Sequence, residues 1–393
     1  MPISVLAQET NTNNSQDNNT NANVEKNSES EETSLISNAV SGLLMEESTG
    51  EIIFEKDKDK QVAVASMTKM VAQIIILENI ESGNIKWSDV VTASKNAADM
   101  GGSQIYLAAN EKMTVRDLFK GISMASANDA VVAMAEYIAG SEDKFVKKMN
   151  DKVKELGLKN TVFKNATGLD EDGHFSSAYD MAIIARTLLS HQEILEFSGV
   201  YEDYLRVNTP NKFWLVNTNK LIKTYDGMDG LKTGYTKEAG YCLTATAKRN
   251  NMRLIGVIMG EETSAKRNEE MSKMLDYGFN LYTVKGYLTT KTKVGTFKND
   301  KSKTGRVNVV PTQDINVLNK KGNKDRKLSY NLEIIKKDIP IKKGDVIGYL
   351  SVHENNKEIY KINVTVDENV ERANILELLL RNIKDIMTGE NIM

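Results

Sequence analysis

The chain has 393 residues, of which 40% are hydrophobic and 27% are charged, so it can bury a sizeable core and include a second domain. Its formal net charge of −3 shows no basic surplus, which argues against a nucleic-acid-binding protein. One cysteine, Cys242, and three widely separated histidines exclude a cysteine-rich zinc site, so we expect no metal and no other cofactor.

The amino-terminal residues resemble the end of a secretory cleavage site, with small residues up to Ala7 and a polar Gln8 after it. We interpret Met1–Ala7 as the remainder of a signal peptide; the alternative is a start methionine followed by unrelated residues. The following segment, up to residue 34, is rich in Asn, Ser, Thr and Glu and predicts a disordered linker. No run of about 20 apolar residues is present to span a bilayer.

Residues 35–287 are predicted to form one α+β domain. Apolar runs flanking Ser48-Thr49-Gly50 predict a hairpin, and Ser66–Glu81 predicts a buried central helix. Further helices are expected at Val115–Met124, Asp129–Ile138, Phe145–Leu156, Ala178–Leu189 and 265–282, and strands at Tyr241–Ala247 and Arg253–Met259. Because strands from both ends bracket the helices, we expect one antiparallel sheet beside a helical lobe.

The character of the chain changes after about residue 288. Short Val/Ile/Thr-rich runs separated by polar turns predict a small all-β domain over residues 288–370. Residues 371–393 predict an amphipathic helix, because Leu376, Leu379, Leu380 and Ile383 fall on one arc of a helical wheel. We expect this helix to lie on a membrane surface; the alternative is that its apolar face packs on the β domain.

The first chemical motif is S-x-x-K at Ser66-Met67-Thr68-Lys69, which opens the apolar helix. Residues three apart share a helix face, so Lys69 is expected over Ser66, where a neutral lysine could remove the hydroxyl proton. The same spacing occurs at Ser141–Lys144, in a polar run where the serine is interpreted as a helix N-cap. A capping serine with a surface lysine is also the alternative for Ser66.

Two further motifs follow in order. In Ser126-Ala127-Asn128, the serine could relay a proton and Asn128 could hold a substrate amide, although Ser126 could also be an N-cap. Lys232-Thr233-Gly234 precedes a strand; the glycine would let a ligand backbone approach, while Lys232 and Thr233 could bind a carboxylate. A second K-T-G at Lys303–Gly305 lies in a lysine-rich turn without a strand before it.

The ordered set S-x-x-K, S-x-N and K-T-G resembles the signature of class A β-lactamases and penicillin-binding proteins. Residues 65–69, 126–130 and 229–241 resemble most closely the low-molecular-mass penicillin-binding proteins that act as D-alanyl-D-alanine carboxypeptidases. The resemblance implies a penicillin-binding-protein/β-lactamase-like transpeptidase fold and a secreted protein of the cell wall. It also implies action on peptidoglycan stem peptides, and β-lactam antibiotics as covalent inhibitors.

The resemblance also implies roles for individual residues. Ser66 would attack the carbonyl between two D-alanines, with Lys69 as its base and Ser126 as a proton relay. Backbone N–H groups of Ser66 and Tyr235 would form an oxyanion hole. The remaining substrate-binding residues are expected to be Asn128, Lys232, Thr233, Gly234 and Arg267.

Two other functions compete with this one. A class A β-lactamase needs a glutamate base, but the usual E-x-x-L-N signature is missing between Asn128 and Lys232. A catalytically silent wall-binding or scaffolding protein is disfavoured because all the catalytic residue types are present. Carboxypeptidase and endopeptidase action stay open as alternatives, and His174, a lone histidine in a loop, is left out of the catalytic set.

Overall fold

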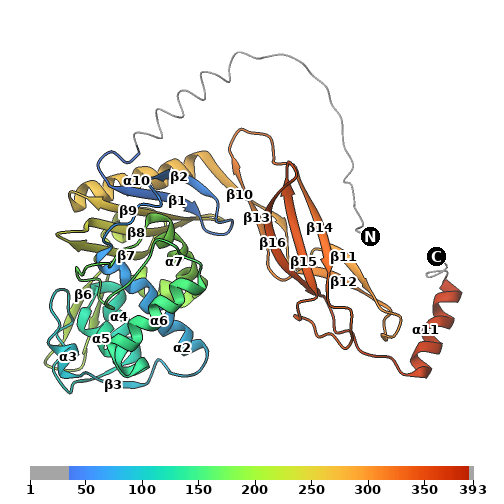
Figure 1. The fold of residues 1–393 in the computed structure, drawn as a ribbon, viewed down its shortest axis with the longest axis horizontal. Coiled ribbons are helices and arrows are strands. Elements are labelled where there is room, and N and C mark those ends of the chain that lie inside the picture. Colours follow the sequence, from blue (N-terminus) through green and yellow to red (C-terminus); the bar gives the residue numbers. More distant parts are fainter. Residues whose placement is uncertain (1–34, 389–393) are drawn as a thin grey trace, which may run out of the picture. The chain divides into compact units, whose positions relative to one another are not determined.

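The computed structural model describes residues 35–388, which form two compact units that divide between Leu281 and Tyr282 (Figure 1). In the part of the chain that is described, no helix is long and apolar enough to cross a membrane. The sequence places the boundary at residue 287, six residues too late, because the strand β10 (Tyr282–Leu288) pairs with β13 (Ile315–Lys320) of the second unit.

The first unit is built on a five-stranded antiparallel sheet in the order β2-β1-β9-β8-β7. The strands are β1 (Ser41–Glu46), β2 (Ile52–Lys56), β7 (Met228–Thr236), β8 (Gly240–Arg249) and β9 (Met252–Glu261). Helices α10 (Ser264–Leu281) and α7 (Ala178–Ser190) both pack on β9, one on each face of the sheet (Figure 1). Both faces of the central strands are therefore covered, which explains their nearly continuous apolar sequence.

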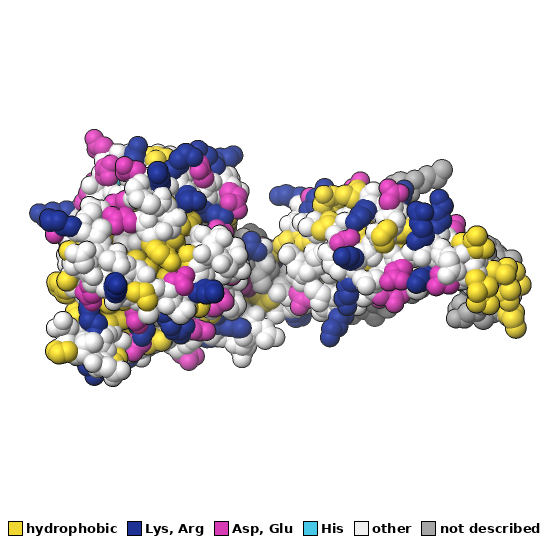
Figure 2. Space-filling model, turned by 90° about the horizontal axis from the view of Figure 1, so that it is seen from below, with side chains coloured by type: hydrophobic (Ala, Val, Ile, Leu, Met, Phe, Trp, Pro, Cys, Tyr) yellow, Lys and Arg dark blue, Asp and Glu magenta, His cyan; other side chains and the backbone are white. Residues whose placement is uncertain are grey.

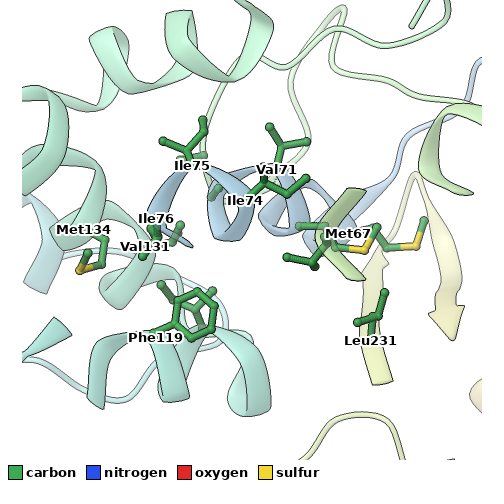
Figure 3. Close-up of a cluster of buried hydrophobic side chains, with 14 of the residues drawn as sticks. Met67, Val71, Ile74, Ile75, Ile76, Phe119, Val131, Met134 and Leu231 are labelled. Carbon is green, nitrogen blue, oxygen red and sulfur yellow. The ribbon is translucent and has the colours of Figure 1, made fainter. Parts of the chain in front are cut away.

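The helical lobe surrounds α2 (Lys69–Glu81), which follows the 3-10 turn η1 (Ala65–Thr68). Residues 69–77 of α2 are all buried, and apolar side chains from neighbouring helices pack around them (Figure 3). Full burial of each Ile, Leu or Val contributes roughly 1.5–3 kcal/mol, so this helix is a rigid support for the residues at its start. The sequence correctly predicts a central buried helix, but Ser66 lies in the 3-10 turn before it.

The other elements of the lobe are mostly short. They are β3 (Val90–Thr92), α3 (Lys95–Ala98), β4 (Lys112–Thr114), α4 (Val115–Lys120), a π turn (Gly121–Ala125), α5 (Asn128–Ala139), α6 (Glu142–Glu155), η3 (Gln192–Ile194), α8 (Leu195–Ser198), β5 (Glu202–Leu205), β6 (Phe213–Val216) and α9 (Leu221–Thr224). The hairpins β3–β4 and β5–β6 have no counterpart in the sequence prediction, because their strands have only three or four residues each.

The second unit contains a five-stranded sheet in the order β11-β12-β16-β15-β14 and the two-stranded sheet β10–β13. The remaining strands are β11 (Gly295–Lys298), β12 (Arg306–Pro311), β14 (Leu328–Ile334), β15 (Gly348–Glu354) and β16 (Lys357–Val366). Its core is made of small aliphatic side chains such as Val309, Leu350 and Val364. The chain then forms α11 (Ile375–Thr388).

Candidate active site

The turn η1 holds Ser66 in a constrained position immediately before α2. Ala65 is buried and has a φ of 47°, a left-handed backbone conformation that is strained for a residue with a side chain. Gly168 presses against this turn so closely that a methyl group on it would overlap the carbonyl of Ala65. The loop around Gly168 thus fixes the backbone that carries the serine hydroxyl.

Lys69 is the buried partner of this serine. Its Nζ lies 2.9 Å from Ser66 Oγ and 2.5 Å from the carbonyl oxygen of Thr167, and the side chain is completely buried. Burial, and secondarily the positive charge of Lys232, holds the pKa of Lys69 well below its ordinary value, against the opposing effect of Asp129. A neutral amine in contact with a hydroxyl can accept its proton, which is the chemistry of a general base.

Ser126 and Asn128 contribute two polar atoms that lack partners among the described residues, namely Ser126 Oγ and Asn128 Oδ1. Asn128 donates from Nδ2 to the carbonyl of Gly101 at 2.7 Å, so only its acceptor is left unpaired. A buried polar atom without a hydrogen bond costs about 1–3 kcal/mol, which a bound ligand would recover. Ser126 is not an N-cap: Ala127 precedes α5, and Ser126 has a left-handed φ of 63°.

The edge strand β7 carries Lys232, Thr233 and Gly234. Lys232 is buried and donates to the carbonyl of Thr233 at 2.9 Å; burial, with the nearby charge of Arg267, lowers the pKa of Lys232 to about 7. Thr233 Oγ1 donates to Thr218 Oγ1 at 2.7 Å. A methyl group on Gly234 would lie 2.7 Å from the carbonyl oxygen of Val64, so β7 passes directly beside the turn that carries Ser66.

Arg267 and Tyr235 complete the predicted set. Only 4% of Arg267 is exposed, and within the described residues its guanidinium forms no ion pair with a carboxylate. A buried cation without a counter-ion is a suitable receptor for a ligand carboxylate. Tyr235 is 56% exposed, with its ring centroid 4.3 Å from that of Tyr241.

Two buried residues outside the predicted set, Asp129 and His174, support this site. The Asp129 carboxylate accepts hydrogen bonds from the backbone N–H groups of Ile105 and Leu107, and its charge acts on Lys69. His174 is buried; its Nδ1 accepts from the backbone N–H of Lys164 at 3.1 Å, so its Nε2 donates to Thr68 Oγ1 at 2.7 Å. The only sequence signal for these two residues is their position within motifs that resemble the family.

Among the described residues, no group of three or more His, Cys, Asp and Glu side chains could hold a metal ion. The site instead combines a hydroxyl, a buried amine and two further buried cations. Such a set can form a covalent ester with a carbonyl compound that also carries a carboxylate.

Comparison with known sequences gives two family matches. Residues 26–263 match the family described as D-alanyl-D-alanine carboxypeptidase, and residues 282–372 match the penicillin-binding protein 5 C-terminal domain. The chain is 47% identical to the D-alanyl-D-alanine carboxypeptidase DacF of Bacillus subtilis over 89% of its length and 90% of the relative's. It is 32% identical to DacA of Escherichia coli, covering 88% of this chain and 87% of that one.

Solved structures agree with the sequence matches. Penicillin-binding protein 5 of Haemophilus influenzae superposes with a TM-score of 0.70 at 31% identity, covering 85% of this chain and 98% of the other. Penicillin-binding protein D2 of Listeria monocytogenes, solved in an ampicillin-bound form, matches 61% of this chain and 97% of its own with a TM-score of 0.56 and 30% identity. The α+β transpeptidase fold predicted from the sequence is confirmed, and the chain belongs to the D-alanyl-D-alanine carboxypeptidase family of serine peptidases.

Proposed function

We propose that this enzyme removes the terminal D-alanine from peptidoglycan stem pentapeptides through an acyl-enzyme on Ser66. The observation that carries this proposal is the 2.9 Å contact between Ser66 Oγ and the Nζ of Lys69, a lysine that burial and Lys232 favour in its neutral form. The family membership supplies the reaction type, and this contact supports Ser66 as the nucleophile and Lys69 as its base.

In the first step, Lys69 Nζ takes the proton from Ser66 Oγ, which attacks the carbonyl carbon between the two D-alanines. Backbone N–H groups of Ser66 and Tyr235 receive the developing negative charge, a contribution of typically about 3–4 kcal/mol per donor. Ser126, whose hydroxyl has no partner among the described residues, relays a proton to the departing amine. Water then hydrolyses the ester and regenerates Ser66.

The substrate is held from both ends of the scissile bond. Arg267 and Thr233 bind the terminal carboxylate, and the buried charge of Lys232 adds to that attraction. Asn128 accepts from a backbone N–H of the stem through its unpaired Oδ1, while Gly234 allows the extended peptide to lie along β7. A free carboxylate beside the scissile bond is therefore the substrate feature that these residues would recognise.

The test is mass spectrometry of a D-Ala-D-Ala-terminated pentapeptide wall fragment after incubation with the enzyme. We expect loss of one alanine with the wild type and none with Ser66→Ala. An unchanged pentapeptide with the folded wild type would contradict the proposed function. Sustained nitrocefin hydrolysis would indicate a β-lactamase instead, an alternative that none of the comparisons supports.

We also propose that α11 holds the enzyme at a membrane surface outside the cytoplasm. Seven apolar side chains of α11 are 46–87% exposed, and they form a continuous patch on the helix (Figure 2): Ile375, Leu376, Leu379, Leu380, Ile383, Ile386 and Met387. Such a face suits partial insertion between lipid headgroups and acyl chains. The predicted signal-peptide remainder and linker lie outside the described residues; they support secretion to the cell wall only as sequence predictions.

Truncation before Glu371 tests the membrane proposal. We expect the truncated enzyme to stay in solution during vesicle sedimentation, with alanine release from a soluble pentapeptide unchanged. The charges of residues 371–385 are balanced, so vesicle binding should depend weakly on anionic lipid. If the full-length protein does not sediment with vesicles, the proposal is contradicted. If the truncated protein unfolds, α11 is a structural element instead.

A further inference from the structure

Arg267 is held by neutral acceptors rather than by an acid. Its Nε and Nη2 donate to the same atom, Oδ1 of the adjacent Asn268, at 3.2 and 2.8 Å. Its Nη1 donates to the carbonyl oxygen of Cys242 at 3.4 Å. Neither acceptor carries a charge, so the guanidinium is fixed in direction while its positive charge is not neutralised.

The unused hydrogens of this guanidinium have a definite location. Arginine has five N–H donors, and three of them are used by Asn268 and Cys242. One hydrogen on Nη1 and one on Nη2 have no partner among the described residues. Two parallel N–H groups on adjacent nitrogens match the two oxygens of a carboxylate, which is the geometry of a bidentate ion pair.

Arg267 also lies close to the strand that is proposed to bind the substrate. Cys242 lies on β8 directly opposite Gly234 on β7, and the charge of Arg267 acts on Lys232. The guanidinium therefore reaches from α10 to β8, and its charge acts on the neighbouring strand that carries Lys232-Thr233-Gly234. A carboxylate bound near Lys232 and Thr233 would therefore be attracted by the charge of Arg267.

From this geometry we infer that Asn268 is a positioning residue that makes Arg267 selective for a free C-terminal carboxylate. The inference rests on the proposed carboxypeptidase function. Asn268 occupies the Nε–Nη2 edge, which leaves the Nη1–Nη2 edge for the substrate. An aspartate at this position would make the same contacts but would neutralise the guanidinium and compete with the substrate's carboxylate.

The experiment compares two peptides, one ending in D-Ala-D-Ala with a free carboxylate and the other with a C-terminal amide. For Asn268→Asp, we expect kcat/KM on the free acid to fall roughly 10- to 100-fold, mainly through KM, and kcat/KM on the amide to change little. Arg267→Ala removes the guanidinium altogether, so it should show the largest loss of kcat/KM on the free acid. Asn268→Gln keeps a neutral acceptor, so it should recover most of the preference for the free acid over the amide.

Asn280→Asp is the matched control, because it adds the same charge at an exposed position of the same helix. This variant should leave kcat/KM on both peptides unchanged. The inference is overturned if Asn268→Asp retains the wild-type ratio of acid to amide, or if it lowers both rates equally. If the wild type releases alanine from neither peptide, the proposed function itself fails, and the inference fails with it.

Discussion

The chain begins two helices with the same S-x-x-K pattern, and the two copies have different environments. At the start of α2, Ser66 Oγ contacts the Nζ of Lys69, and that lysine is completely buried. At the start of α6, Ser141 Oγ accepts from the backbone N–H of Lys144 at 3.3 Å, and the Lys144 side chain is exposed. The second copy is an ordinary N-cap, as the sequence predicts.

The difference shows that the four residues alone do not make a reactive serine. Two features distinguish the α2 copy: Lys69 has lost its hydration, and the buried cation Lys232 acts on it. In the α6 copy, by contrast, the Lys144 side chain is exposed to solvent, and the first turn also holds Glu142 and Asp143. The chain therefore offers a matched control for variants of Ser66 and of Lys69.

The largest effect is expected for Lys69→Arg compared with Lys144→Arg. Arginine stays charged in proteins, so it cannot take the proton of Ser66, and the rate constant of acylation by a fluorescent penicillin should fall about 10²- to 10⁴-fold. Lys144→Arg should acylate at the wild-type rate. Near-normal acylation of Lys69→Arg would show that Lys69 is a structural lysine.

The duplicated K-T-G motif supplies the second comparison, Gly234→Ala against Gly305→Ala. A methyl group at residue 234 meets the backbone of Val64, so either β7 or the serine turn must move, and alanine release should fall roughly 100-fold. Gly305 has a φ of 72° and would meet only the flexible side chain of Arg381, so its variant should lose about 1 kcal/mol of stability without losing activity. Equal activity of the two variants would argue against close contact at Gly234.

A third comparison uses the pH dependence of acylation in Lys232→Gln and Lys303→Gln. A lysine base is active when neutral, so the rate rises with pH through the pKa of Lys69. Removing the positive charge at residue 232 should raise that pKa and move the acid limb toward higher pH. Lys303→Gln, on an exposed lysine paired with Glu371, should leave the profile in place. If the acid limb of the pH–rate profile does not move in Lys232→Gln, Lys232 does not lower the pKa of Lys69.

The smallest effect is expected for His174, whose hydrogen bond holds Thr68 in place; the α6 copy lacks such a contact. Burial lowers the pKa of His174 to about 4, below its unfolded value of about 6.5. Between pH 6.5 and pH 4 the unfolded state binds this proton more readily than the folded state does. The free energy of unfolding is therefore at its full value above about pH 6.5, and it declines by up to about 3 kcal/mol as the pH falls to about 4.

Urea unfolding followed by tryptophan fluorescence can measure this decline, because both tryptophans, Trp87 and Trp214, lie in the catalytic unit. His174→Gln can still donate to Thr68 but cannot titrate, so its stability should change less between pH 6.5 and 4. Identical slopes for the wild type and the variant would exclude His174 as the titrating group.

The sequence predicts the long elements well for a physical reason. The central strands and helices are buried, so β9 is marked by a continuous apolar run and α7 by apolar residues at helical spacing. The hairpin β5–β6 is short and partly exposed, and β10 mixes polar and apolar residues, so neither has a strong pattern. The error in the domain boundary follows from missing β10.

For the site, the motifs pointed to Ser66 and Lys69, whose side chains are in contact, and to Lys232, whose charge acts on Lys69. Their conformations were beyond sequence reasoning: Ser66 lies in a strained 3-10 turn and Ser126 in a left-handed conformation, both imposed by tertiary contacts. The contact between His174 and Thr68 joins positions 106 residues apart, and no spacing rule indicates it. Arg267 was predicted only through resemblance, because no local pattern reveals that it lies beside β7.

The most direct test of the central claim is to locate the acyl group. The enzyme would be incubated with penicillin and digested, and the labelled peptide would be identified by mass spectrometry. We predict one β-lactam per chain on the peptide that contains Ser66, retained in Ser141→Ala and absent in Ser66→Ala. Labelling of Ser141, or labelling of Ser66→Ala at the wild-type rate, would contradict the assignment of Ser66 as the nucleophile.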